Sequence, residues 1–392
     1  MATKKQTSVR TTVETTQAMP PKPVPATYPG AVWGVTQFEP CAAPITKKRG
    51  IEDGDEQPTY SLRHADKSLW VYGVTDVAAH GLRDSVVRFN SAERYTDPMY
   101  LDMLKVQWLH LFAKHRGDSA AIEPAGIISV PIALYNDQAA TEAVKRSVLG
   151  EHQIEDAQGC TLRINITDKK LSVLPESVGA LYHFAYDHRT GRPRDSQLDA
   201  SGAVLVVDIG YLTTDYSLHV DMKYQRATSH TETTLGFWKV AQAVRDALKD
   251  TRGREIDISD IDAALRLISD IDIGAPKLIR YEQGTQIADV QPVYDAEVRN
   301  LALAVRDALL NRYKQSISLV LLAGGGAYHV RKLLADMLKI PVVIAPDAAS
   351  ANVLGGYTRL ASSARKSGAI NPLLWCVDNG NGGSKGVSNE TL

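Results

Sequence analysis

The chain of 392 residues lacks the features that mark secreted, zinc-binding or membrane proteins. Its three cysteines, Cys41, Cys160 and Cys376, are far apart and form no C-x-x-C pair, which argues against a disulfide framework and a zinc site. No apolar run approaches the roughly 18 residues of a membrane span, and the N-terminal residues contain no signal-peptide core. We therefore expect a cytoplasmic protein that does not contact membranes.

The chain also lacks an excess of charge of either sign. Its formal net charge is −1, so whole-chain electrostatics gives no reason to expect direct nucleic-acid binding. Hydrophobic residues make up 44% and charged residues 23%, which are the proportions of an ordinary globular protein. The length is sufficient for two or more domains.

Strand-like and helical segments alternate along most of the chain, which predicts an α/β architecture with mostly parallel sheets. The strands fall into two groups, before residue 175 and after residue 200, and so predict two lobes. Residues 1–28 are rich in Thr, Lys and Pro, and residues 366–392 are rich in Gly, Asn and Ser, so both segments are predicted to be disordered tails. Hairpins are predicted within 160–173 and 277–291.

The turn after the apolar strand Val204–Val207 is the strongest candidate for a binding site. Asp208 ends this strand, and Gly210 lets the backbone pass close to a ligand. The amides and hydroxyls of Thr213 and Thr214 can face phosphate oxygens, and a carboxylate beside a phosphate is a usual way to hold hydrated Mg²⁺. The same D-x-G pattern also occurs where an Asp merely caps a turn.

Two further segments have ligand-binding character. In the first, a buried strand runs into Gly324, Gly325 and Gly326 and then into a helix, which matches neither G-x-G-x-x-G nor the Walker pattern. These glycines also suit an ordinary tight turn. In the second, Glu176 lies in the first turn of a helix over 175–186, where a carboxylate usually acts as a cap. Opposite a magnesium-phosphate turn, the same carboxylate could orient water for phosphoryl transfer.

Together, these motifs resemble those of the actin-fold ATPases. Residues 175–180 resemble the first connecting helix, 208–215 the second phosphate loop, 321–328 the adenosine loop and 345–356 the second connecting segment. Within that superfamily the likeness is greatest to actin-like proteins of the bacterial and archaeal plasmid-segregation type, ParM or StbA. The resemblance covers about residues 68–362.

The resemblance implies an actin-like two-lobed α/β fold of duplicated ribonuclease-H-like domains, with a nucleotide cleft between the lobes. The first lobe would comprise residues 29–186 and the second 200–350, and a C-terminal helix over 351–365 would return to the first lobe. The implied ligands are ATP or GTP and Mg²⁺. The implied site residues are Glu176 as the water-polarising group, Asp208 as the magnesium ligand through water, Gly210, Thr213 and Thr214 at the β- and γ-phosphates, Gly324, Gly325 and Gly326 behind the adenosine, and Gly236 in the nucleoside pocket.

One expected element of the family is missing from the early part of the sequence. The family opens with a first phosphate loop of the form D-x-G-x-x-x-x-K, preceded by a strand. No Asp precedes Asp53, no Gly precedes Gly30, and Asp53-Gly54 lies in an acidic segment without a strand pattern. We therefore expect the first lobe to lack this loop. The chain would then begin downstream of the true start, have an altered first lobe, or bind nucleotide without turning it over.

The resemblance suggests a cytoskeletal ATPase whose filaments segregate plasmid DNA through a DNA-binding adaptor protein. Two alternatives stay open. One is a non-hydrolysing actin-fold protein that only binds nucleotide. The other is a small-molecule kinase on the same fold, which would need a sugar-binding insert and a catalytic Asp in the first lobe, and the sequence suggests neither.

Overall fold

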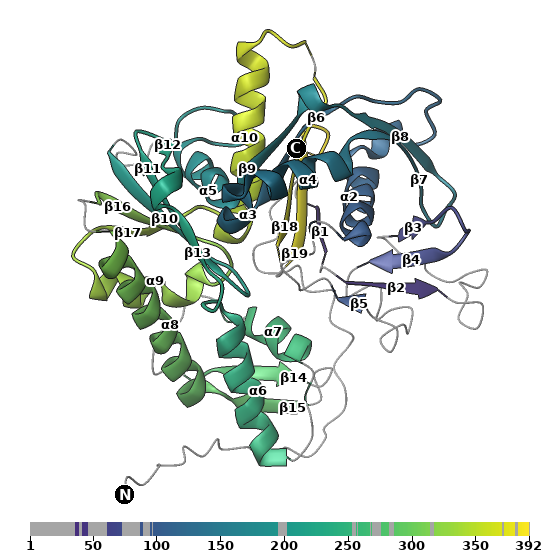
Figure 1. The fold of residues 1–392 in the computed structure, drawn as a ribbon. Helices are drawn as coiled ribbons and strands as arrows, with labels where there is room; N and C mark the ends of the chain where they lie inside the picture. Colours follow the sequence, from purple (N-terminus) through teal and green to yellow (C-terminus); the bar gives the residue numbers. More distant parts are fainter. Residues whose placement is uncertain are drawn as a thin grey trace, which may run out of the picture.

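A computed structural model describes the greater part of the chain (Figure 1). The described residues are 36–38, 41–45, 61–72, 87–88, 95, 97–194, 202–252, 256, 258–266, 268, 276–281, 286–313, 317–370, 372–380 and 383–391. The predicted tail over residues 1–28 and the Asp53-Gly54 pair lie outside these residues. None of the described helices is long and apolar enough to cross a lipid bilayer.

Each lobe contains a central sheet, and five strands of one sheet match five strands of the other in spatial order and direction. In the first lobe, the strands in spatial order are β1 (Thr36–Phe38), β19 (Gly383–Ser388), β18 (Leu374–Gly380), β6 (Ala125–Val130) and β9 (Leu171–Pro175). In the second lobe, they are β12 (Lys223–Tyr224), β11 (Thr214–Val220), β10 (Ala203–Ile209), β16 (Leu319–Ala323) and β17 (Val342–Ile344), with β13 (His230–Glu232) also paired to β11.

The matching strands pair in matching ways. In each sheet an antiparallel hairpin, β18–β19 or β10–β11, forms the centre. On one side of the hairpin, a short strand (β1 or β12) pairs antiparallel with β19 or β11. On the other side, two strands (β6 and β9, or β16 and β17) continue the sheet in parallel with β18 or β10. Each sheet is therefore mixed, so the expectation of mostly parallel sheets was wrong. The repetition agrees with the predicted duplication of one domain.

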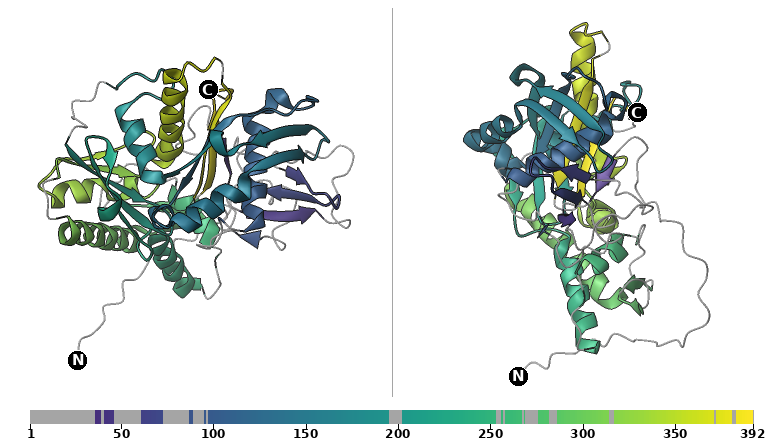
Figure 2. Two further views of the ribbon diagram at one scale, coloured as in Figure 1. Left: turned by 45° about the horizontal axis from the view of Figure 1, so that its top comes forward. Right: turned by 90° about the vertical axis from the view of Figure 1, so that its right-hand side faces the viewer.

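The hairpins occupy different places in the chain although they occupy the same place in the sheets. The β10–β11 hairpin precedes the other strands of its sheet in sequence, whereas β18–β19 follows all the strands of its own. The β18–β19 hairpin lies between β1 and β6 in the first-lobe sheet, beside α10 (both yellow in Figure 2). The first lobe is thus a circularly permuted version of the second.

The position of β18 and β19 contradicts the predicted disordered tail over 366–392. Trp375, Cys376 and Val377 are fully buried, and β18 pairs in parallel with β6 at the centre of the sheet. Trp375 packs edge-on against Trp108 of the first-lobe core, with ring centroids 5.5 Å apart. The Gly and Asn residues that suggested disorder belong to a hairpin, and the short apolar run before them is a core strand.

The remaining elements enlarge each lobe. An outer sheet of the first lobe has the order β5 (Val87–Arg88), β2 (Cys41–Ile45), β4 (Leu69–Tyr72), β3 (Ser61–Arg63), β7 (Gly150–Glu155) and β8 (Thr161–Ile166). The other first-lobe helices are α2 (Pro98–Leu111), η4 (Ala113–His115), α3 (Ile132–Asn136), α4 (Gln138–Val148) and η5 (Asp168–Lys170). Because β8 and β9 join different sheets, the hairpin predicted within 160–173 was wrong.

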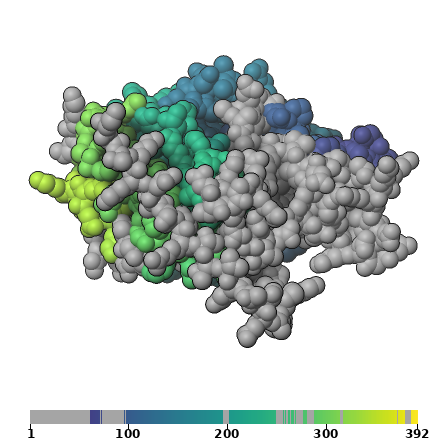
Figure 3. All heavy atoms as spheres, turned by 90° about the horizontal axis from the view of Figure 1, so that it is seen from below, coloured from purple at the N-terminus to yellow at the C-terminus, as the bar shows by residue number. Residues whose placement is uncertain are grey.

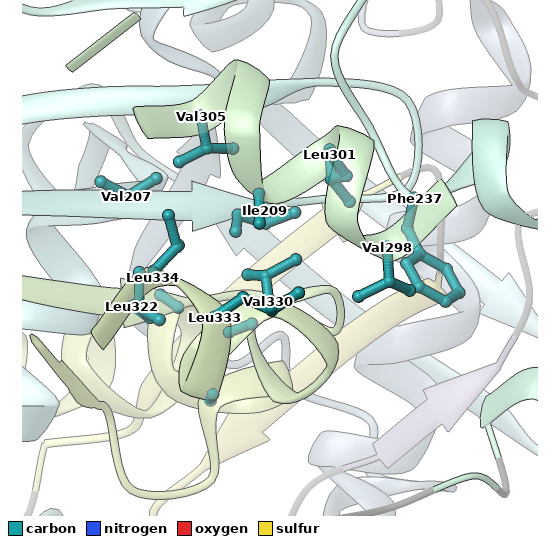
Figure 4. Close-up of a cluster of buried hydrophobic side chains, with 14 of the residues drawn as sticks. Val207, Ile209, Phe237, Val298, Leu301, Val305, Leu322, Val330, Leu333 and Leu334 are labelled. Atoms are coloured by element: carbon teal, nitrogen blue, oxygen red, sulfur yellow. The ribbon is translucent and has the colours of Figure 1, made fainter. Parts of the chain in front are cut away.

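In the second lobe, helices cover the sheet and support a small subdomain at the lower end of Figure 1. The further elements of the second lobe are η6 (Arg226–Thr228), α6 (Trp238–Arg252), α7 (Ile258–Arg266), β14 (Leu278–Tyr281), β15 (Gln286–Asp289), α8 (Gln291–Arg312), α9 (Ala327–Met337) and η7 (Ala348–Ser350), of which α6, α7, β14 and β15 form the small subdomain. The predicted hairpin within 277–291 is confirmed by the antiparallel pair β14–β15. Figure 4 shows Ile209 of β10 packed between Leu301 of α8 and Val330 of α9. Seen from below in Figure 3, the two lobes lie on opposite sides of the molecule.

Two helices join the lobes, α5 (Glu176–Ala185) and α10 (Ala351–Lys366), and they cross at glycines. A Cβ atom at Gly355 would lie 1.7 Å from the carbonyl oxygen of Gly179. A Cβ atom at Gly179 would lie 2.1 Å from the carbonyl oxygen of Asn352. The backbones of the two helices are therefore in direct contact, which only glycine permits at these two positions.

We expect Gly355→Ala to destabilise the protein severely, because the added methyl group meets the backbone of α5 at Gly179 and His183. Overpacking of this kind costs about 1–3 kcal/mol or more. Urea denaturation, which measures the free energy of unfolding, checks this predicted loss of stability. Ser363→Ala, an exposed position on the same helix, is the control and should change it by less than about 0.5 kcal/mol. Equal stability of the two variants would contradict the crossing described above.

Candidate functional site

The turn predicted to contact phosphate connects β10 to β11. Asp208 and Asp215 face each other across the hairpin, and the Gly210 amide closes the turn by donating to the Thr213 carbonyl at 2.9 Å. Thr213 is half-buried in the turn. Thr214 is fully buried, and its hydroxyl donates to the Leu235 carbonyl at 2.7 Å. This bond removes the Thr214 hydroxyl from the predicted phosphate contacts.

Gly236 lets the start of α6 dock on the same turn. The amide of Phe237 donates to the Gly210 carbonyl at 3.1 Å, and the amide of Trp238 donates to the Tyr211 carbonyl at 2.8 Å. A Cβ atom at Gly236 would lie 2.4 Å from that Tyr211 oxygen. Gly236 is therefore required by the contact between two backbones, whether or not it also borders a nucleoside.

The three consecutive glycines wrap around the end of β10. Gly324 has φ +79°, and a Cβ atom there would lie 2.3 Å from Asp208 Oδ1. The amide of Gly326 donates to the Ile209 carbonyl at 2.9 Å. Gly325 is exposed, and a Cβ atom there would meet nothing within 4 Å. Two of the three glycines are thus required by the adjacent phosphate turn, and the third faces open space.

A D-x-G-x-x-x-x-K motif is present in the chain, at Asp378, Gly380 and Lys385. It forms the β18–β19 hairpin, in which Asp378 pairs with Lys385 and Gly380 with Gly383. Residues 381 and 382 between the strands lie outside the described residues. The expectation that the first lobe lacks its phosphate loop was therefore wrong. A search for the literal pattern along the whole sequence would have found it.

The two hairpins bring two buried carboxylates together, one from each lobe. Asp208 and Asp378 are each 5% exposed. Burial raises the pKa of Asp208 to about 6; the amide of Asn352 lowers it, the negative charge of Asp378 raises it further, and Lys385 lowers it. Asn352 Nδ2 donates to Asp208 Oδ2 at 2.6 Å, and Lys385 Nζ donates to the Ala349 carbonyl. Sequence reasoning assigned no role to Asp378, Lys385 or Asn352.

Glu176 is the first residue of α5 and follows the end of β9. Its side chain is half-buried, and Oε1 accepts a hydrogen bond from the Tyr95 hydroxyl at 3.4 Å. Glu176, Asp208 and the triple glycine all follow the carboxyl ends of strands. In open α/β sheets, ligands bind at this edge. The arrangement suits a ligand with anionic groups together with a cation, since a lysine and two buried carboxylates converge there.

Comparison with solved structures identifies the architecture. The apo ParM protein of pSK41 is similar with a TM-score of 0.60 at 14% sequence identity, over 85% of this chain and 95% of that one. The archaeal actin homologue Ta0583 in complex with ADP is similar with a TM-score of 0.60 at 15% identity, over 84% of this chain and 97% of that one. A 15-stranded ParM filament from Clostridium botulinum is similar with a TM-score of 0.61 at 13% identity, over 83% of this chain and 92% of that one. The chain has an actin-like fold.

Sequence comparison agrees with this assignment for part of the second lobe. A family described as the archaeal actin homologue MreB-like, C-terminal, matches residues 206–336. No curated protein sequence gave a match. The predicted resemblance to actin-like proteins of the ParM type is confirmed for the fold. Relative to the family order, in which the first phosphate loop opens the chain, this actin-like chain has that loop after α10.

The raised pKa of Asp208 predicts that this residue lowers stability at neutral pH. Its ordinary pKa is near 3.8 and its folded value about 6, so its cost to stability is absent below pH 4 and grows as the pH rises to 6. Without nucleotide and metal, Asp208→Asn should raise the free energy of unfolding at pH 7 by about 2 kcal/mol. Urea denaturation at pH 7 and pH 4 measures this difference. A gain of the same size at both pH values would contradict the assignment.

The matched control is Asp246→Asn, which replaces a carboxylate whose side chain is 55% exposed. This variant should shift stability by less than about 0.5 kcal/mol at either pH.

Proposed function

We propose that this chain is a nucleotide-dependent actin-like cytoskeletal protein that binds ATP or GTP with Mg²⁺ between its lobes. The observation that carries the proposal is the approach of Asp208 and Asp378, on equivalent hairpins of different lobes, beside Lys385. Each hairpin supplies a carboxylate and a glycine, and the first supplies a lysine as well. The similarity in fold to an archaeal actin homologue solved with ADP supports the same site for this chain.

The residues of the site fit a hydrated magnesium ion. Burial, and to a lesser degree the negative charge of Asp378, raises the pKa of Asp208, and a divalent cation beside both carboxylates would stabilise their ionised forms. Asn352 Oδ1 is buried without a hydrogen-bond partner in the described part of the chain. No cluster of three His, Cys, Asp or Glu side chains among the described residues could hold a metal. Phosphate oxygens and water would complete the ligands, and bound Mg²⁺ would neutralise phosphate charge.

Hydrolysis would use Glu176 as the residue that orients water. The carboxylate would accept a hydrogen bond from a water molecule and later its proton, while the water oxygen forms a bond to the γ-phosphorus and the bond to the leaving diphosphate breaks. Lys385 and the amides of the two turns would stabilise the negative charge. Gly325, which faces open space, is the glycine best suited to a close approach by the nucleoside.

Filament formation and a role in segregating plasmid DNA complete the proposal. The similarity in fold to a ParM filament supports self-assembly, which would need head-to-tail contacts that do not close. Attachment to DNA would require a DNA-binding adaptor protein, since the net charge of −1 gives no reason for direct binding. We expect the protein to act in the cytoplasm, where nucleoside triphosphates and reduced cysteines are normal.

The non-hydrolysing alternative rested on the missing first phosphate loop, and the motif at 378–385 removes that argument. Nothing in the described residues favours the small-molecule kinase.

We expect Mg²⁺ and ATP or GTP to induce assembly of the wild-type protein. Light scattering and high-speed sedimentation measure filaments, and a phosphate-release assay measures hydrolysis. Asp378→Asn and Lys385→Met should weaken both, because they remove charges from the first phosphate loop. The exposed control Asp336→Asn should match the wild type.

Glu176→Gln separates hydrolysis from assembly. It should slow phosphate release by about 100-fold or more while filaments still form, because a general base contributes about that factor. If no nucleotide-dependent assembly occurs with either nucleotide, the filament proposal is wrong. Unchanged phosphate release in Glu176→Gln would remove Glu176 from catalysis.

A further inference from the structure

The structure contains a second residue that contacts the Glu176 carboxylate. The hydroxyl of Tyr95 lies 3.4 Å from Glu176 Oε1, and the two residues are 81 positions apart in the sequence. Tyr95 is 2% exposed, so its hydroxyl is at the inner side of the site and not on the surface. The contact therefore joins two distant segments of the first lobe.

The surroundings of Tyr95 hold its ring in place. The ring packs against that of Tyr100 on α2, with centroids 5.1 Å apart and a tilt of 52°. Tyr100 is itself 1% exposed. Asp97 caps α2 by accepting from the amide of Met99 at 2.8 Å, which fixes the chain two residues after Tyr95. A rigid phenol costs little side-chain entropy when it makes a hydrogen bond, so this position suits an orienting group.

The direction of the hydrogen bond follows from the two groups. A carboxylate can only accept, so the phenol donates to Oε1. The bond also stabilises the ionised form, as does the position of Glu176 at the N-terminus of α5. The 3.4 Å between the Tyr95 hydroxyl and Glu176 Oε1 is longer than a typical O–H···O hydrogen bond. Catalytic hydrogen bonds often become shorter when the substrate is bound.

We propose that Tyr95 is a positioning residue for hydrolysis, which holds the Glu176 carboxylate ionised and in place to orient the attacking water. This inference rests on the proposed ATPase or GTPase function. Because Tyr95 packs against Tyr100 of α2, it links this helix to the reacting group.

The test compares wild type with Tyr95→Phe, Glu176→Gln and the double variant, using phosphate release from Mg²⁺ and the preferred nucleotide across pH 5 to 9. Tyr95→Phe keeps the ring and removes only the hydroxyl. We expect kcat to fall about tenfold with KM changed by less than about twofold. The acid limb of the pH profile should move up by about one pH unit, because Glu176 loses a donor to its ionised form. A merely structural role would not move this limb.

Tyr100→Phe is the matched control, since it removes a neighbouring buried hydroxyl and keeps both rings. It should leave the pH profile unchanged. The double variant should be no slower than Glu176→Gln alone, because Tyr95 acts through Glu176. Thermal unfolding of each variant confirms that the fold is retained.

The outcomes distinguish the two proposals. A wild-type protein that hydrolyses neither nucleotide overturns both. An active wild type with an inactive Glu176→Gln and an unchanged Tyr95→Phe overturns only the role of Tyr95. Additive losses in the double variant would also overturn it, since they would show that Tyr95 acts independently of Glu176.

Discussion

The hydrogen bond from Asn352 Nδ2 to Asp208 Oδ2 joins the three parts of the molecule that make the site. Asn352 is on α10, its carbonyl lies against Gly179 of α5, and Asp208 ends the central strand of the second lobe. A hydrogen bond to a charged group contributes about 1.5–3 kcal/mol, and losing one partner here would leave a buried carboxylate unsatisfied. At this place α10 thus contacts both α5 and the second lobe, through glycine backbones and one amide.

Strand pairing, and not chain order, determines where the two hairpins with their D-x-G sequences lie. The β18–β19 hairpin occupies in its sheet the position that β10–β11 occupies in the other, although it comes from the opposite end of its lobe's sequence. Buried apolar side chains such as Trp375 secure it there. One consequence of the permutation is that α10 is the element that precedes β18, the strand that contains Asp378.

The sequence predicted what depends on local pattern. The D-x-G turn at Asp208, the triple glycine and the two-lobed α/β fold could be predicted because apolar strands followed by glycine turns are local signals. Composition misled at 366–392, where glycines that serve a tight hairpin were taken as a sign of disorder. The contacts of Asn352 with Asp208 and of Tyr95 with Glu176 span 144 and 81 positions, so no local pattern encodes them. Whether the Thr214 hydroxyl faces phosphate or the Leu235 carbonyl likewise depends on packing that only the fold determines.

The central claim is that hairpins from both lobes form one nucleotide site. Hydrogen–deuterium exchange followed by mass spectrometry, with and without Mg²⁺ and nucleotide, tests it most directly, because amides that bind phosphate exchange more slowly. We predict slower exchange in peptides covering both 205–218 and 374–388 when nucleotide is bound. Protection confined to 205–218, or absent from both segments, would contradict the account.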